Sequence, residues 1–389
     1  MKYFTIISSL LLLSLGKSFL FSKITSKRSI RFNSDSPSNY ENDFKYSTDY
    51  YQHLLKYDLI ESSSSSSVLL SSGHDPSLTW SIKRFKNYQI FVDNLEKIQQ
   101  FNQQSDGLKL DMNQFGDQYD FDSTCQESCH LDINNYISSQ QEYIGFKRPP
   151  FLGLTKIFKN ILKPLFFRSN PTPPSKNWKL FLPPVKNQLH CGSCWAFSTT
   201  NSIETLMNVH NYTYNRLSEQ ELVDFSIEND GCAGGLMHLA YDYIIQEQGL
   251  VSNEDYPYII GSPNKDNVNM SSFTKVNGSH IKNYEFIIPR SIQDIKESLQ
   301  HGPIAIALDA SSFLFRFYKE GVIDLPRNFS RDINHAVLLT GYEQDENGTH
   351  WIIQNSWGES WGEQGFARIR VRNGNGVLLC QLYGVYPQY

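Results

Sequence analysis

The sequence has no strong excess of charge of either sign. Its 389 residues carry a formal net charge of −5 at pH 7, which is too modest to indicate a nucleic-acid partner. It also lacks a stripe of basic residues interleaved with aromatic ones, so we expect no binding to nucleic acid. With 40% hydrophobic residues, the composition is globular, and the chain is long enough for two or three domains with cores of their own.

Long hydrophobic runs are scarce. The first 18 residues, MKYFTIISSLLLLSLGKS, have a lysine, then an apolar run, then small residues. This pattern is typical of a secretory signal peptide, and an uncleaved anchor is the alternative. No other segment approaches 18 uninterrupted apolar residues, so we expect a soluble mature product without stable membrane insertion.

Cysteine is infrequent, with six residues in the chain. A secreted protein enters an oxidising compartment, in which disulfides can form. Acceptor motifs for N-glycosylation agree with the secretory route, and all of them lie in the carboxy-terminal half: Asn211, Asn269, Asn277, Asn328 and Asn347. We therefore expect the protein in the secretory pathway, with a lysosomal or extracellular destination.

The composition changes along the amino-terminal half. Residues 19–76 are polar, include the run SSSSSS and are expected to be mostly disordered. Apolar residues then recur at helical spacing from Asp75, which predicts a helix of about 25 residues. The alternating stretch 108–117 predicts a short strand. Residues 145–175 have six lysines or arginines and no acid, and we interpret them as a linker, or alternatively as a basic amphipathic helix at a membrane.

The carboxy-terminal half is helical first and rich in strands second. A helix is predicted from Cys194 to about Val209, a second after the capping box of Ser218 and Glu221, and a third from Ser291. Strands are predicted in four later segments: 303–310, 334–344, 349–358 and 365–373. This segregation favours an α+β fold of two lobes with a cleft between them.

The stretch NQLHCGSCWAFS contains a CxxC whose chemistry is open to three interpretations. A redox pair requires a strand immediately before it, whereas Pro183 and Pro184 precede this one. A zinc site requires two or more further ligands, and only Cys232 and scattered histidines are available. The third interpretation makes Cys194 a nucleophile, because the start of a helix favours its thiolate.

A nucleophilic thiolate needs a proton acceptor and donor nearby. His335 and Asn355 stand at the ends of predicted strands, twenty residues apart. His335 is expected to form an ion pair with Cys194 and to protonate the leaving amine. Asn355 would fix the orientation of the imidazole, and Trp357 would shield their hydrogen bond from water.

The motifs KNQLHCGSCWAFS, GCAGG, NHAV and NSWGESWGEQGFARI occur in this order between residues 174 and 389. Together they resemble the papain family of cysteine proteases. The resemblance extends to the family's prosegment motifs, at Phe91, Asn94, Ile98, Asn102, Asn113, Phe115 and Asp117. It implies a helical lobe and a β-barrel-like lobe with the active-site cleft between them, preceded by a helical inhibitory prosegment.

The resemblance also implies roles for individual residues. Gln188 corresponds to the side chain that, with the Cys194 backbone N–H, stabilises the oxyanion. Gly234 and Gly235 correspond to positions whose backbone pairs with an extended substrate. Trp357 is also expected to contact the substrate. A pocket for the second residue before the cut bond is implied at four apolar positions, which favours a bulky hydrophobic residue and a cathepsin L-like enzyme: Leu236, Met237, Ala307 and Ala336.

The family pattern also assigns some of the cysteines. It implies a disulfide between Cys191 and Cys232. Cys380 corresponds to one end of a second bridge whose other cysteine is missing, so we expect a buried thiol there. Cys125 and Cys129 are expected to pair locally, and two free thiols or a metal site are the alternatives.

We therefore expect a proenzyme in four parts: a signal peptide (1–18), a low-complexity start of the propeptide (19–76), the inhibitory prosegment with its linker (77–172) and the mature protease (173–389). As a cysteine endopeptidase it would hydrolyse proteins and peptides, be inhibited by its own prosegment, need no cofactor or metal, and be a monomer. Two alternatives are a non-catalytic secreted binding protein or prosegment inhibitor, and a CxxC oxidoreductase with a Cys191–Cys194 disulfide.

Overall fold

The computed structural model describes residues 46–57, 76–118, 172–212, 216–259, 268–326, 330 and 332–389. The chain divides into two units, Met1–Tyr51 and Gln52–Tyr389, and the second contains all the contacts discussed below. The expected signal peptide, the serine run, Cys125, Cys129, most of the linker and Asn328 lie outside the described residues.

Among the residues before 119 that the structure describes, there are two helices and one short strand. Helix α3 is Ser47–Lys56, α4 is Pro76–Gln104 and strand β1 is Lys109–Leu110. The predicted long helix is confirmed by α4. Helix α3 falls within the segment expected to be mostly disordered or loosely attached, and most of the rest of that segment lies outside the described residues. The predicted strand at 108–117 is only two residues long, because a turn follows it, in which Asn113 Oδ1 accepts a hydrogen bond from Phe115 N at 3.1 Å.

Two asparagines of α4 hold the segment that follows it. Asn102 Nδ2 donates to Leu110 O at 2.8 Å, and its Oδ1 accepts from Leu110 N at 2.9 Å. Asn94 Nδ2 donates to Gly116 O at 2.9 Å. These side chains replace the backbone partners that a two-residue strand lacks, so the turn at 113–116 has a defined position on α4.

The helical lobe is built around α7 (Cys194–Val209), with α8 (Glu219–Phe225), α9 (Met237–Gln246) and the 3-10 turn η4 (Gly231–Ala233) around it. Nearly all of α7 is buried, as expected of a helix surrounded by other elements. Helix α8 begins as predicted, because the Ser218 hydroxyl accepts from Glu221 N at 2.9 Å. The short helix α9 was not predicted.

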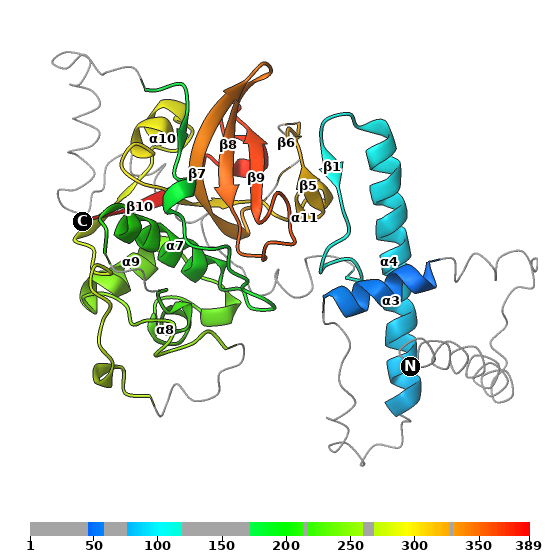
Figure 1. Cartoon of the computed structure of the whole chain (residues 1–389), viewed down its shortest axis with the longest axis horizontal. Helices are drawn as coiled ribbons and strands as arrows, with labels where there is room; N and C mark the ends of the chain where they lie inside the picture. Colours follow the sequence, from blue (N-terminus) through cyan, green and yellow to red (C-terminus); the bar gives the residue numbers. More distant parts are fainter. Residues whose placement is uncertain are drawn as a thin grey trace, which may run out of the picture. The chain divides into compact units, whose positions relative to one another are not determined.

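The second lobe is an eight-stranded sheet in the order β3-β10-β4-β7-β8-β9-β6, with β2 off this path and paired to residues 341 and 342 of β7 (Figure 1). Its strands are β2 (Lys176–Asn177), β3 (Asn283–Phe286), β4 (Ile304–Leu308), β6 (Val322–Ile323), β7 (His335–Asp345), β8 (Gly348–Gln354), β9 (Phe366–Arg370) and β10 (Gly384–Gln388). The four predicted strands are confirmed by β4, β7, β8 and β9. The other pairings of the sheet are antiparallel, but β6 and β9 are parallel.

The remaining elements after residue 172 are short. They are η3 (Lys179–Phe181), η6 (Met270–Ser272), α10 (Ile292–Ser298), α11 (Phe313–Arg316), β5 (Tyr318–Glu320) and η7 (Val377–Leu379). Helix α10 confirms the predicted third helix, and the Ser291 hydroxyl caps it by accepting from Asp294 N at 3.2 Å. The two-lobed α+β architecture is therefore the one expected from the sequence.

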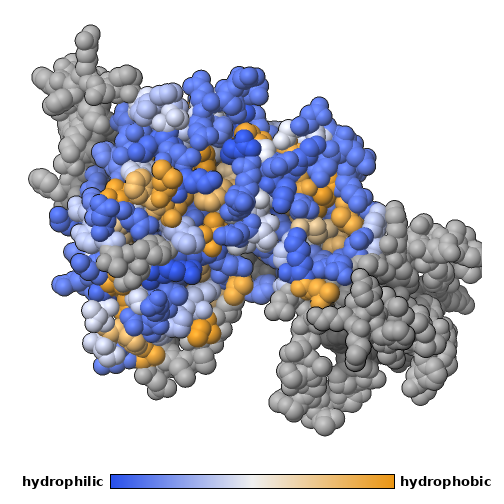
Figure 2. Space-filling model, in the orientation of Figure 1, coloured by the Kyte–Doolittle hydropathy of each residue, from blue (hydrophilic) through white to orange (hydrophobic). Residues whose placement is uncertain are grey.

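Hydrophilic residues dominate the face of the molecule seen in Figure 2, on which hydrophobic residues form small separate patches. Among the described residues, no helix combines the length and the apolar character needed to cross a bilayer.

Candidate active site

Cys194 is the first residue of α7 and is buried. The amino end of a helix carries partial positive charge, which stabilises a thiolate relative to a thiol. The preceding residue, Ser193, does not cap the helix with its side chain. Its hydroxyl instead forms a 2.7 Å hydrogen bond with the Tyr258 hydroxyl.

A hydrogen bond between α7 and β7 positions Cys194 relative to His335. The Ser198 hydroxyl donates to Val337 O at 2.8 Å. Ser198 lies one helical turn after Cys194, and Val337 lies two residues after His335 on the same face of its strand. This bond therefore places the start of α7 beside the start of β7, and both Cys194 and His335 are almost fully buried there.

The hairpin of β7 and β8 brings His335 and Asn355 together. Leu338 is opposite Gln354 in this hairpin. His335 Nε2 lies 2.8 Å from Asn355 Oδ1, so the amide oxygen accepts the Nε2 proton and leaves Nδ1 for chemistry. Extended three residues beyond the Leu338–Gln354 pair, the antiparallel register places His335 opposite Trp357. Their rings stack with centroids 4.7 Å apart.

The side-chain amide of Gln188 is held in one orientation. Its Nε2 donates to Cys191 O at 2.9 Å, and its Oε1 accepts from the Ser356 hydroxyl at 2.6 Å. Its backbone N–H also donates to Ser356 O at 2.9 Å. The amide N–H groups are therefore directed toward the loop that leads into Cys194, which is a suitable arrangement for stabilising an oxyanion.

Comparison with known proteins agrees with this arrangement. The profile of the papain family cysteine protease domain matches residues 172–384, more than half of the chain. The profile of the cathepsin propeptide inhibitor domain (I29) matches residues 78–121. The chain belongs to the papain family of cysteine proteases.

Relatives from several kingdoms share this family. Falcipain-2a of Plasmodium falciparum is 33% identical over 313 residues, which cover 76% of this chain and 60% of the falcipain. The chain thus spans about three fifths of the length of that relative. Cysteine protease XCP2 of Arabidopsis thaliana is 30% identical, with 77% and 78% of the two chains covered. The structure of digestive procathepsin L 3 from the larval midgut of Tenebrio molitor is similar at a TM-score of 0.65 and 26% identity, over 89% of this chain and 99% of that one.

A disulfide joins the loop that precedes Cys194 to the segment around η4. Cys191 and Cys232 are bonded to each other, as the resemblance implied, and Gly192 N donates to Cys232 O at 2.9 Å. The alternative of a Cys191–Cys194 redox pair was therefore wrong. Gly235 must be glycine, because a Cβ there would lie 2.5 Å from Asn229 Oδ1.

The residues expected to form the pocket for the substrate's hydrophobic residue come from three elements. Met237 begins α9, and Ala307 and Ala336 are opposite each other on β4 and β7. These three are buried in the same apolar cluster as Cys194, and Leu236 packs against it while remaining partly exposed. Gly234 is buried and has φ 125°, a conformation that favours glycine.

The prosegment contacts Trp357 and strand β5 directly. Strand β1 is antiparallel to β5. Gln114 Nε2 donates to Trp357 O at 2.9 Å, and the Phe115 ring meets the Trp357 indole edge to face at 4.9 Å. Because Trp357 stacks on His335, the turn at 113–116 covers the histidine side of the site.

Lys186, Glu204 and Glu219 form a buried ionic cluster that no sequence motif indicated. Lys186 Nζ contacts Glu204 Oε1 at 2.7 Å and also bonds Glu219 Oε1. Burial acts to lower the pKa of Lys186, but the two carboxylates outweigh it and raise this pKa. Burial raises the pKa of Glu204. Since Lys186 is two residues before Gln188, the cluster fixes the start of the loop that carries the amide.

Two further expectations concern residues outside the site. Cys380 is a buried free thiol, and burial raises its pKa to about 12, so it is a poor nucleophile. The glycosylation motifs within the described residues have exposed asparagines: Asn211, Asn269, Asn277 and Asn347. Within the described residues, no group of three or more His, Cys, Asp or Glu side chains is arranged to hold a metal ion.

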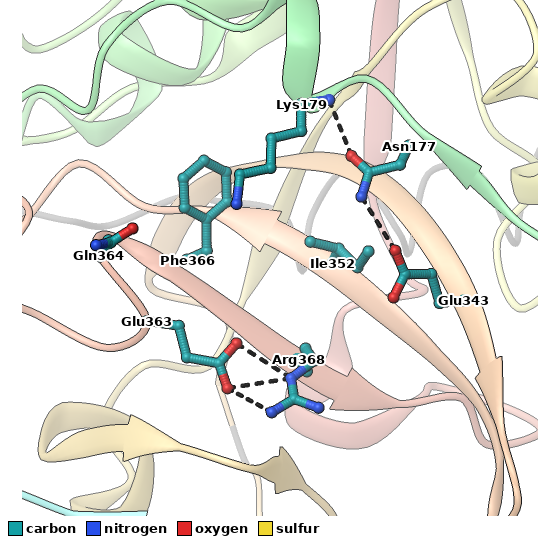
Figure 3. Close-up of a pocket in the computed structure, with 8 residues that line it drawn as sticks. All are labelled: Asn177, Lys179, Glu343, Ile352, Glu363, Gln364, Phe366 and Arg368. Atoms are coloured by element: carbon teal, nitrogen blue, oxygen red, sulfur yellow. Dashed lines mark hydrogen bonds and ion pairs between the residues drawn. The ribbon is translucent and has the colours of Figure 1, made fainter.

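A surface pocket of about 280 Å³ lies on the β-rich lobe and includes none of the expected site residues (Figure 3). Within it, Arg368 is paired with Glu363, and Glu343 accepts from Asn177 Nδ2 at 3.1 Å. We assign no function to it.

Proposed function

We propose that the protein is a cysteine endopeptidase that is made as an inactive precursor and cuts peptide bonds through a thioester on Cys194. The observation that carries this proposal is the junction of α7 with the β7–β8 hairpin. It gathers Cys194, His335 and Asn355, with Gln188 held beside them. Each group has a role that peptide hydrolysis requires.

The reaction begins with attack of the Cys194 thiolate on the scissile carbonyl carbon. The oxyanion that forms accepts hydrogen bonds from the Gln188 amide and the Cys194 backbone N–H. His335 then protonates the leaving amine, which departs and leaves a thioester on Sγ. Asn355 holds the imidazole in the required orientation, and the Trp357 ring limits access of water to their hydrogen bond.

A water molecule completes the cycle. His335, now neutral, accepts a proton from this water as it attacks the thioester carbonyl, and the tetrahedral intermediate again places its oxyanion at Gln188. Collapse of the intermediate releases the carboxylic acid and returns the sulfur to Cys194 as a thiolate paired with the imidazolium.

The substrate preference follows from the residues around the nucleophile. Gly234 and Gly235 leave room for the backbone of an extended peptide to pair with theirs. Leu236, Met237 and the two alanines at 307 and 336 offer only apolar atoms to the second residue before the cut bond. We therefore propose a preference for a large hydrophobic residue at that position.

The precursor is inactive because residues 113–116 lie against Trp357. We propose that cleavage near residues 172–175 releases the mature protease, residues 173–389. We also propose that residues 1–18 are removed and that the protein then reaches a lysosome or the cell exterior.

An irreversible epoxide directed at thiols tests the mechanism. Acidified protein is incubated with the epoxide, and the adduct is located by peptide mass mapping. We expect labelling at Cys194 and not at buried Cys380, with loss of the Cys194 adduct in His335→Ala. Labelling that is indifferent to this substitution contradicts the ion pair and the mechanism built on it.

The same experiment separates the enzyme from a non-catalytic binding protein of this fold. A binding protein would neither react at Cys194 nor cleave a peptide with a hydrophobic residue two before the scissile bond. Intact Cys194, His335, Asn355 and Gln188 favour the enzyme.

A further inference from the structure

Arg316, at the end of α11, is a buried cation in contact with the prosegment. Its side chain is only 4% exposed. Its Nη2 donates to Phe115 O and to Gln118 O, both at 2.7 Å. In return, Asn113 Nδ2 donates to Arg316 O at 2.7 Å. One protease residue thus bonds the prosegment turn in both directions.

The surroundings of this guanidinium are aromatic. Its Cζ lies 5.7 Å from the ring centre of Phe115 and 5.1 Å from that of Phe317. The backbone of Arg316 is held by Trp361, whose Nε1 lies 3.2 Å from Arg316 O. A charge in such a setting interacts more strongly with hydrogen-bond acceptors than it would in water.

The position of Arg316 relative to the catalytic centre follows from Phe115. Phe115 accepts from Arg316 through its carbonyl and contacts Trp357 through its ring. A single residue therefore bridges the guanidinium and the indole that stacks on His335. Because His335 protonates the leaving amine, this is the side on which the substrate continues beyond the cut bond.

A second cation three residues after Arg316 forms an ion pair with the prosegment. Lys319 Nζ lies 3.7 Å from Asp111 Oδ2, and both side chains are about half exposed. Strand β5, to which Lys319 belongs, pairs with prosegment strand β1. Two cations of residues 316–319 therefore face the prosegment, one bonded to carbonyl oxygens and one close to an acid.

We propose that in the mature protease Arg316 binds a substrate carboxylate within the first three residues after the scissile bond. This inference rests on the proposed function. Removal of the prosegment takes away the two carbonyl acceptors that bond Nη2. A carboxylate is a stronger acceptor for a guanidinium than a neutral carbonyl and matches its planar geometry. An extended peptide advances about 3.3–3.6 Å per residue, so only the first few residues after the cut remain near Trp357.

The test uses mature protease and internally quenched peptides that are identical except for Glu or Gln at one of these three positions. The ratio of kcat/KM for Glu over Gln is measured at low and high salt. We expect a ratio of about five or more at one position, as for a favourable partly exposed ion pair. In Arg316→Gln this ratio should fall toward one. In Arg316→Lys, which keeps the positive charge, it should lie between one and the wild-type value.

A matched control removes the same charge elsewhere. Arg372 is exposed and paired with Asp324, so Arg372→Gln should retain the wild-type ratio. Active enzyme is counted by epoxide titration of Cys194, and cleavage of a fluorogenic amide with no amino acid after the scissile bond is measured in parallel.

The outcomes are distinguishable. Equal rates for Glu and Gln in titratable wild-type enzyme overturn the assignment of Arg316, as does a preference that survives in Arg316→Gln. Absence of both titration and cleavage refutes the proposed function and the assignment with it.

Discussion

His53, on helix α3, is predicted to make the precursor sensitive to acid. Its ring lies against those of Tyr57 and Phe91, with centroids 5.1 and 5.0 Å away. Burial, with a smaller contribution from the charge of Lys56, lowers its pKa to about 4. Asp117 Oδ1 lies 4.0 Å from Nε2, and despite this nearby carboxylate the effect of burial on the pKa of His53 prevails.

The direction of the pH effect follows from the two pKa values. An unfolded histidine has a pKa of about 6.5, whereas the folded value is about 4. Between these pH values the unfolded state binds more protons, so stability is complete above pH 6.5 and falls as the pH drops to 4. A shift of about 2.5 units corresponds to about 3 kcal/mol of unfolding free energy.

The loss of stability should extend to the turn at 113–116, which contacts Trp357. A Cβ built on Gly116 would lie 2.7 Å from His53 Cε1, so the imidazole packs directly against the backbone of that turn. The turn includes Gln114 and Phe115, which contact Trp357. Charging His53 should therefore loosen the prosegment where it blocks the site.

The measurement uses a Cys194→Ala background, so that the precursor cannot cleave itself. Urea unfolding at pH 7 and at pH 4 is compared for this protein and for its His53→Phe variant, which keeps an aromatic ring. We expect the His53 protein to lose about 3 kcal/mol more between the two pH values. His301 is exposed, so His301→Phe is the control and should behave like the parent. An equal pH-dependent loss with and without His53 refutes the reasoning.

Three further predictions concern the protease domain. Gln188→Ala should lower kcat about 100- to 1000-fold with a smaller effect on KM, because one oxyanion donor is removed; an unchanged kcat contradicts that role. Lys186→Met should destabilise the domain by about 3–5 kcal/mol in urea unfolding, since it leaves buried carboxylates without their cation. Replacing Cys191 and Cys232, which are 41 residues apart, by serine should cost about 4 kcal/mol by the loop-entropy relation, and a midpoint equal to the wild type's would argue against it.

Much of the fold could be predicted because the patterns are local. The α7 helix has the predicted bounds, and Ser218 and Ser291 cap helices as their sequence contexts indicated. The elements that were missed, such as α3, α9 and β10, are short. They are stabilised by neighbours that come from distant parts of the chain, as where β10 pairs with β3 and β4, and a local pattern does not reveal such neighbours.

In the site, too, residues in local motifs could be predicted, whereas contacts between distant segments could not. Cys194, His335 and Asn355 were proposed from their order and spacing, and the structure shows a hydrogen bond of 2.8 Å between His335 and Asn355. Arg316 was not identified, because its two acceptors are about 200 positions away in sequence. The buried position of Lys186 was equally absent from any motif.

The sequence by itself indicated a candidate nucleophile and proton donor and predicted the helix and strands that carry them, since each depends on residue type and on periodicity within a short segment. Tertiary structure alone decided which prosegment atoms meet Trp357, what the Arg316 guanidinium bonds, and that the His53 imidazole is taken out of water. These are properties of burial and of distance between remote segments, and they come into existence only when the chain has packed.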